Sequence, residues 1–161
     1  MRATSSVKTR HSLVSENASH THFSEHDTSI TAPWILLAED QERVVEVVLH
    51  SLPDRFKVVG VAKNGVHALD LARKLLPDVV ILDICMPRLN GIQTAWRLKE
   101  LDSYPKVVFL SGYADHDFVE AAFSAGALAY VLKPCLATEL IPAIQSALEG
   151  NTFVSPLIQL R

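Results

Sequence analysis

Short apolar runs alternate with longer segments of mixed polarity from residue 33 onward. Five runs are almost continuously apolar, which is typical of parallel strands buried on both faces. They lie at residues 34–38, 57–62, 79–82, 106–110 and 128–132. The segments between them repeat apolar residues with helical spacing, at 41–51, 66–76, 92–101, 118–125 and 139–148. This alternation predicts an α/β fold in which right-handed crossovers build a doubly wound parallel sheet of five strands with five helices.

Proline and glycine mark the expected helix ends. Pro77 should end the second helix. Gly126 and Gly150 follow the fourth and fifth helices, where glycine is expected to form a left-handed C-terminal cap. Thr138 is the predicted N-cap of the fifth helix. Pro142 would then fall in its first turn, where the missing N–H costs little.

The first 32 residues differ in composition from the rest of the chain. Serine, threonine and histidine fill half of these positions, and large apolar residues are sparse. Such a segment buries too little surface to offset the loss of chain entropy, so residues 1–32 are predicted to be a disordered tail. Its histidines are expected to be solvated. The folded domain is predicted at 33–150, followed by a short C-terminal tail at 151–161 without a separate output domain.

Charge and cysteine content exclude several classes of protein. The formal net charge is -3 and the isoelectric point is about 6.1, which argues against binding nucleic acid or anionic lipid through bulk positive charge. No apolar run reaches the roughly 18 residues that span a bilayer. Cys85 and Cys135 are expected to be free thiols in the cytoplasm, because a strand separates their positions by about 10 Å across the sheet.

Polar residues follow four of the five predicted strands. Glu39 and Asp40 come after the first strand, Asp83 after the third, Ser111 after the fourth and Lys133 after the fifth. Ligands of open α/β sheets bind at these carboxyl ends. Carboxylates there suit Mg²⁺, and a carboxylate can also be a phosphoryl-accepting nucleophile beside a neutralising ammonium. Taken alone, the acidic pair could simply favour a helix N-terminus.

Four motifs at these strand ends together resemble the receiver domain of two-component response regulators. They are Leu-Leu-Ala-Glu-Asp at 36–40, Asp-Ile-Cys-Met-Pro-Arg-Leu-Asn-Gly at 83–91, Leu-Ser-Gly at 110–112 and Tyr-Val-Leu-Lys-Pro at 130–134. The resemblance covers roughly residues 34–150. It implies the flavodoxin-like (CheY-like) fold, with a five-stranded sheet in the order 2-1-3-4-5. The Lys133–Pro134 peptide can be cis at low cost.

The resemblance implies a magnesium and phosphorylation site. Asp83 matches the phosphoacceptor of the family. Glu39 and Asp40 match the acidic pair that helps to hold Mg²⁺, together with Asp83 and the backbone carbonyl of Cys85. Glutamate at the first position of the pair gives one ligand a longer reach than the aspartate seen in many receivers.

Three further matches concern the transferred group and the response to it. Ser111 matches the hydroxyl that contacts the phosphoryl group, and Lys133 matches the lysine that pairs with it. Tyr130 matches the switch aromatic. We expect the loop after Ser111 to move toward a phosphorylated Asp83, with Tyr130 turning inward into the space that is freed.

The family also implies partners. A histidine kinase or histidine phosphotransfer protein would supply the phosphoryl group, and an unknown downstream protein or a phosphorylation-dependent homodimer would use the surface of the last two helices and the fifth strand. Neither direct DNA binding, nor a membrane, nor enzymatic activity beyond self-catalysed phosphorylation and dephosphorylation is expected. Residues 143–156 resemble receivers that precede a LuxR-type helix-turn-helix, so a truncated transcriptional regulator is an alternative.

Two other classes remain as alternatives. An aspartyl-phosphate phosphatase of the haloacid dehalogenase type would need an acid two residues after Asp83, where Cys85 stands. A flavodoxin-like cofactor binder would need a phosphate-cradling first loop, whereas residues 39–41 are acidic. Cys85 is instead expected to influence how readily water reaches an acyl phosphate on Asp83.

Overall fold

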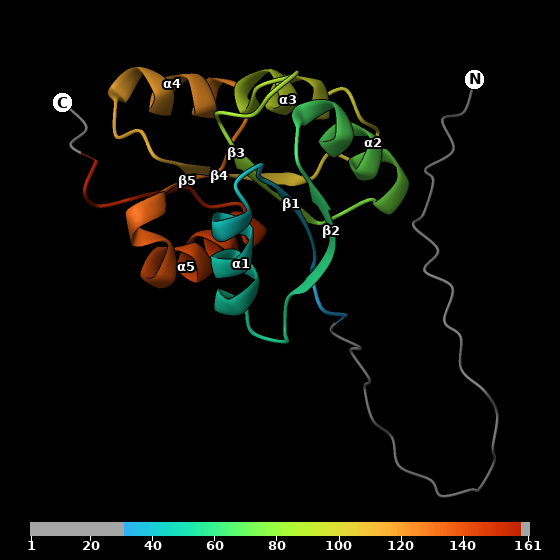
Figure 1. Cartoon of the computed structure of the whole chain (residues 1–161), viewed down its shortest axis with the longest axis horizontal. Helices are drawn as coiled ribbons and strands as arrows, with labels where there is room; N and C mark the ends of the chain where they lie inside the picture. Colours follow the sequence, from blue (N-terminus) through green and yellow to red (C-terminus); the bar gives the residue numbers. More distant parts are fainter. Residues whose placement is uncertain (1–30, 159–161) are drawn as a thin grey trace, which may run out of the picture. The chain divides into compact units, whose positions relative to one another are not determined.

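The strands of the predicted sheet are found almost where the apolar runs place them (Figure 1). The structure is a computed structural model that describes residues 31–158. Its first five strands are β1 (Trp34–Ala38), β2 (Lys57–Ala62), β3 (Val79–Asp83), β4 (Lys106–Ser111) and β5 (Ala129–Leu132). All of them pair in parallel, in the order β2-β1-β3-β4-β5. The fold class is therefore confirmed. The N-terminal tail was predicted to be disordered. Its residues up to 30 lie outside the part of the chain that the structure describes, so this stays a prediction.

A sixth strand corrects the predicted strand count. β6 (Phe153–Val154) pairs in parallel with β5 and extends the sheet at that edge. The backbone N–H of Phe153 donates to the carbonyl of Leu128 at 2.9 Å, and that of Ser155 donates to Tyr130 at 2.9 Å. Ser155 and Ile158 are buried, so residues 153–158 belong to the domain rather than to a loose tail. A two-residue strand is too short to show a periodic pattern.

Helices cover both faces of the sheet. Those in the described part are α1 (Glu42–Ser51), α2 (Gly65–Leu75), α3 (Gly91–Leu98), α4 (His116–Ser124) and α5 (Leu136–Leu148). α1 and α5 lie on one face, and α2, α3 and α4 lie on the other (Figure 1). Successive residues of a strand alternate between the two cores: Ile35 and Leu37 face α1 and α5, whereas Leu36 faces the opposite layer. No helix within residues 31–158 is long and apolar enough to span a bilayer.

The start of α5 was predicted wrongly. A 3-10 turn, η1 (Lys133–Cys135), leads directly into the helix, whose N-cap is Cys135 rather than Thr138. Pro142 consequently lies inside the helix instead of in its first turn. The buried stripe of α5 begins at Leu136, and packing this stripe against the sheet outweighs the hydrogen bond that proline cannot make.

Gly91 seats α3 directly behind the end of β3. Its N–H donates to the carbonyl of Ile84 at 2.8 Å, and a Cβ at this position would lie 2.1 Å from the carbonyl oxygen of Asp83. Asn90 and Gln93 form a capping box at the same helix start. The loop after Asp83 is thus held close to the sheet. No peptide bond among the described residues is cis, so the cis form considered for Lys133–Pro134 is not observed.

Candidate functional site

Three carboxylates meet where β1 and β3 end. Glu39, Asp40 and Asp83 each offer a carboxylate oxygen, and these oxygens lie within 4.8 Å of one another. Glu39 and Asp83 are buried, whereas Asp40 is exposed to solvent. The backbone accounts for this convergence, because β1 and β3 are adjacent parallel strands and Ala38 pairs with Leu82 in register. The sequence prediction that these residues share one edge is confirmed by their positions.

Lys133 bridges the two buried carboxylates. Its Nζ lies 2.9 Å from Oε2 of Glu39 and 3.2 Å from Oδ1 of Asp83. The lysine side chain is only 17% exposed, which limits screening of both ion pairs by solvent. Burial alone would lower the pKa of Lys133, but its bonds and charge interactions with Glu39 and Asp83 raise it above the ordinary value. The ammonium therefore stays charged at physiological pH.

The cluster still carries more negative than positive charge. Burial raises the pKa of both Asp83 and Glu39 above the ordinary carboxyl value, although Lys133 opposes the rise. One oxygen of Glu39 accepts a hydrogen bond from the N–H of Gln41 at 2.9 Å. Oε2 of Glu39, which pairs with Lys133, and Oδ2 of Asp83 are both buried without a hydrogen-bond partner among the described residues. A hard cation that prefers oxygen ligands fits this donor set and would offset the excess charge.

Ser111 and Tyr130 lie on the neighbouring strands and form a separate hydrogen-bonded group. Oγ of Ser111, at the end of β4, accepts from the N–H of Tyr113 at 3.1 Å. The hydroxyl of Tyr130 donates to the carbonyl of Tyr113 at 2.7 Å. Burial raises the pKa of Tyr130, while a side-chain hydrogen bond with Ser111 opposes the rise. Both residues are fully buried.

Tyr130 lies inside the domain, next to the loop after β4. Its side chain is fully buried, which is the inward position that the switch hypothesis uses, and the movement of Tyr130 on phosphorylation stays a prediction. Its hydroxyl is held by the loop after β4, through Tyr113. Any movement of this tyrosine would break or shift that hydrogen bond.

Tyr113 is a neighbour of the site that the sequence did not reveal. Its ring stacks on Phe118 of α4, with the centroids 4.8 Å apart, and remains half-exposed. Contact with the Cys85 thiol raises the pKa of Tyr113. Both Cys85 and Cys135 are free thiols, and Cys85 is exposed. Tyr113 comes two residues after Ser111, as Cys85 comes two after Asp83, but a lone tyrosine after a strand gives no functional signal by itself.

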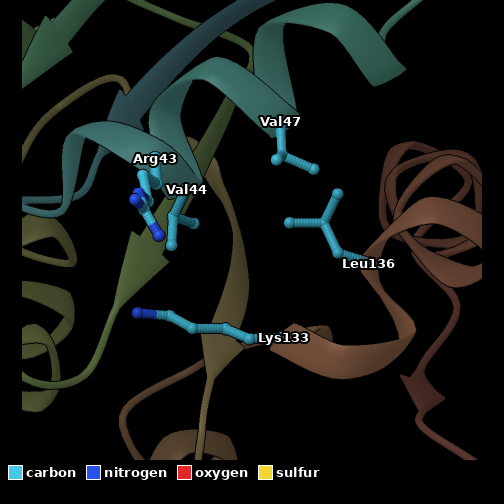
Figure 2. Close-up of a pocket in the computed structure, with 5 residues that line it drawn as sticks. All are labelled: Arg43, Val44, Val47, Lys133 and Leu136. Atoms are coloured by element: carbon cyan, nitrogen blue, oxygen red, sulfur yellow. The ribbon is translucent and has the colours of Figure 1, made fainter.

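A shallow hollow adjoins Lys133 on the side of α1. It encloses about 170 Å³ and is lined by Lys133, Leu136 and three residues of α1, Arg43, Val44 and Val47. Figure 2 shows Val47 and Leu136 facing each other across it, with Arg43, Val44 and Lys133 grouped nearer the sheet. Val47 is 48% exposed. The hollow therefore combines an apolar floor with two basic side chains next to the acidic cluster.

This fold with acids and a lysine at the carboxyl edge defines a class of signalling domain, and comparison with known proteins agrees. The response regulator receiver domain family matches residues 35–145. The chain therefore belongs to this family, and the resemblance seen in its motifs is confirmed.

Individual relatives show the same relationship. The chain is 37% identical over 124 residues to the transcriptional regulatory protein PdtaR of Mycobacterium tuberculosis, a match that covers 76% of this chain and 60% of PdtaR. It is 29% identical over 117 residues to the chemotaxis protein CheY of Halobacterium salinarum, covering 73% of this chain and 98% of CheY. The crystal structure of a LuxR-family two-component response regulator from Aurantimonas sp. has a TM-score of 0.74 at 29% identity, covering 79% of this chain and 92% of that one.

Proposed function

We propose that the chain accepts a phosphoryl group on Asp83 from a histidine kinase or histidine phosphotransfer protein, with Mg²⁺ held by Glu39, Asp40 and Asp83. The observation that carries this proposal is the position of Lys133, 2.9 Å from Glu39 and 3.2 Å from Asp83, beside a third carboxylate. The predicted fourth ligand is the backbone carbonyl of Cys85, which follows β3 at the same edge. Bound Mg²⁺ would neutralise negative charge on the transferred group.

The residues of the chain have distinct parts in this transfer. A carboxylate oxygen of Asp83 forms a bond to phosphorus while the bond from phosphorus to the donor nitrogen breaks, and the electron pair returns to the imidazole. The product is an acyl phosphate. Lys133 is already charged and directed at Asp83, so it neutralises the arriving group without reorganising. Water later cleaves the acyl phosphate and releases inorganic phosphate, so we propose no enzymatic activity on other substrates.

The hollow beside Lys133 is our candidate for the docking site of the phosphoryl donor. It lies next to the acidic cluster, and its apolar residues Val47 and Leu136 are flanked by Arg43. A donor helix that places a histidine over Asp83 would bury these side chains at the same time. We propose a cytoplasmic location, because the chain would have to meet such a kinase there.

The output surface is proposed to be formed by α4, β5 and α5. Phosphorylation adds about two negative charges and three strong acceptors close to Ser111, which can draw the loop after β4 toward Asp83. A downstream protein or a second copy of the chain would bind the altered surface, without direct contact to DNA. Beryllofluoride with Mg²⁺ should shift the amide signals of Ser111 and Tyr130, and unchanged signals there would refute this switch.

The transfer itself is tested by incubation with acetyl phosphate and Mg²⁺ followed by intact mass measurement. Wild type should gain the mass of one phosphate, and Asp83→Asn should gain none. Asp70→Asn is the matched control, because Asp70 is an exposed aspartate of α2 paired with Lys74 outside the site. Phosphorylation of Asp83→Asn, or none of wild type, contradicts the proposal. Sustained hydrolysis of phosphate esters would favour the phosphatase alternative.

A further inference from the structure

The hydroxyl of Ser155 connects two parts of the chain that lie on either side of Lys133. Ser155 follows β6 and is fully buried. Its Oγ accepts a hydrogen bond from the N–H of Leu132 at 2.8 Å and donates one to Oε2 of Glu139. Its own N–H donates to the carbonyl of Tyr130. The hydroxyl thus replaces a backbone carbonyl at the point where the β5–β6 ladder stops.

The two partners of this hydroxyl enclose the segment that presents Lys133. Leu132 is the last residue of β5 and directly precedes Lys133, and Glu139 lies in the first turn of α5. Between them, residues 133–138 contain η1 and the helix start. One side chain from the C-terminal segment therefore ties both ends of this turn, on the side of the sheet remote from β1 and β3.

The placement of Lys133 depends on this turn. The lysine has a long and flexible side chain, and its ammonium must reach Glu39 and Asp83 at the same time. What the fold can fix is the position of the backbone from which the side chain extends. A shift of 1 Å in a group that acts on a transition state can lower the rate by up to about a hundredfold.

We propose that Ser155 is a positioning residue for Lys133, and that it fixes the turn from which the lysine reaches the phosphoryl group. This inference rests on the proposed phosphorylation of Asp83. Ser155 bonds Leu132, Glu139 and Tyr130, so it acts on the site through the turn that carries Lys133. Its effect should fall on the transfer step, where the position of the ammonium matters.

The test compares Ser155→Ala with Val154→Ala. The first variant removes the hydroxyl, whereas the second weakens the packing of β6 and keeps it. With saturating acetyl phosphate and Mg²⁺, Ser155→Ala should be phosphorylated about tenfold more slowly than wild type. Val154→Ala should be within twofold of wild type.

The Glu139→Ala variant and the NMR signal of Lys133 provide two further measurements. Glu139→Ala removes one of the two hydrogen bonds from the partly exposed side and should slow phosphorylation less than Ser155→Ala. The NMR signal of the Lys133 ammonium should shift in Ser155→Ala and not in Val154→Ala, whether or not the protein is phosphorylated. Equal rates and equal signals in the two variants would overturn the role of Ser155. A wild type that takes up no phosphate would instead refute the proposed function, while the ammonium signal still decides the position of Lys133.

Discussion

The two halves of the carboxyl edge of the sheet differ in how far their buried polar groups are paired. At β1 and β3, the buried Glu39 and Asp83 share one ammonium, and an oxygen of Asp83 has no hydrogen-bond partner among the described residues. At β4 and β5, the buried hydroxyls of Ser111 and Tyr130 are both hydrogen-bonded. The first half is electrostatically incomplete and gains from a bound cation. The second half is complete, so motion there requires bonds to break.

This difference suggests how a local charge becomes a change of surface. A phosphoryl group on Asp83 would offer new acceptors to the incomplete half. Oγ of Ser111 accepts from the N–H of Tyr113, and its own proton can be donated to such an acceptor once the loop after β4 moves toward Asp83. The hydrogen bond from Tyr130 to the carbonyl of Tyr113 would be disturbed by the same movement. The hydroxyls of Ser111 and Tyr130 could therefore transmit a change at Asp83 to the surface of α4.

Removing Lys133 should have the largest effect, because it leaves two buried carboxylates unpaired. We expect Lys133→Met to lower the free energy of unfolding by about 3 kcal/mol at neutral pH without Mg²⁺, measured by urea denaturation. Adding Mg²⁺ should restore part of this loss, since a bound cation stabilises the folded state by mass action.

Lys74→Met is the matched control for this change. Lys74 also pairs with an aspartate, Asp70, at 2.9 Å, but both side chains are more than half exposed. The control should cost about 0.5 kcal/mol or less. Equal losses in the two variants would show that solvent screens the ion pairs of Lys133 as strongly as it screens exposed pairs.

Neutralising Asp83 should have the opposite sign. Burial raises the pKa of Asp83 above its ordinary value of 3.8, so the folded state holds this proton more tightly than the unfolded state. Stability from the protonated form is full below 3.8 and is lost as pH rises through the folded-state pKa. Without Mg²⁺, Asp83→Asn should therefore be more stable than wild type at neutral pH, by about 1 kcal/mol.

The same variant separates charge from metal binding. The stability gain of Asp83→Asn should shrink as the pH is lowered through the raised pKa of Asp83, where wild type regains the proton. Mg²⁺ should stabilise wild type much more than the variant, because the variant lacks a ligand. Urea titrations across pH, with chelator or with Mg²⁺, give both comparisons. A variant that is destabilised at neutral pH would mean that Asp83 is favoured as a carboxylate even without the ion.

The parts that the sequence predicted and missed differ in their physical origin. The strands from Trp34–Ala38 to Ala129–Leu132 were predictable because short, almost continuously apolar runs indicate burial on two faces. The acids and Lys133 were predictable because strand ends define an edge. β6, the start of α5 and the hydrogen bonds of Ser155 were missed, since they depend on contacts across 16 or more positions in the sequence. The buried state of Tyr130 likewise depends on a carbonyl 17 residues away.

Tyr130→Phe tests the completeness of the second half of the edge. The change leaves the ring in place and removes the donor to the carbonyl of Tyr113, so we expect a loss of about 1 kcal/mol in the free energy of unfolding. Tyr104→Phe is the control, because Tyr104 donates to the carbonyl of Gly126 at 2.8 Å but is 41% exposed. Water can replace that bond, so the control should lose about 0.5 kcal/mol at most. An unchanged free energy of unfolding in Tyr130→Phe would mean that the hydrogen bond to Tyr113 contributes little to stability.

Cys85→Asn should have the smallest effect, confined to the lifetime of the phosphorylated state. Cys85 is exposed, touches Tyr113, and stands two residues after Asp83, where it borders the approach of water. A carboxamide there can hydrogen-bond a water molecule that a thiol holds only weakly. The dephosphorylation rate should change by about threefold, which corresponds to less than 1 kcal/mol in the barrier. Loss of phosphate over time, followed by intact mass, gives this rate. An unchanged rate in Cys85→Asn would assign control of water access to Tyr113 and the loop after β4, and so to the hydrogen-bonded half of the edge.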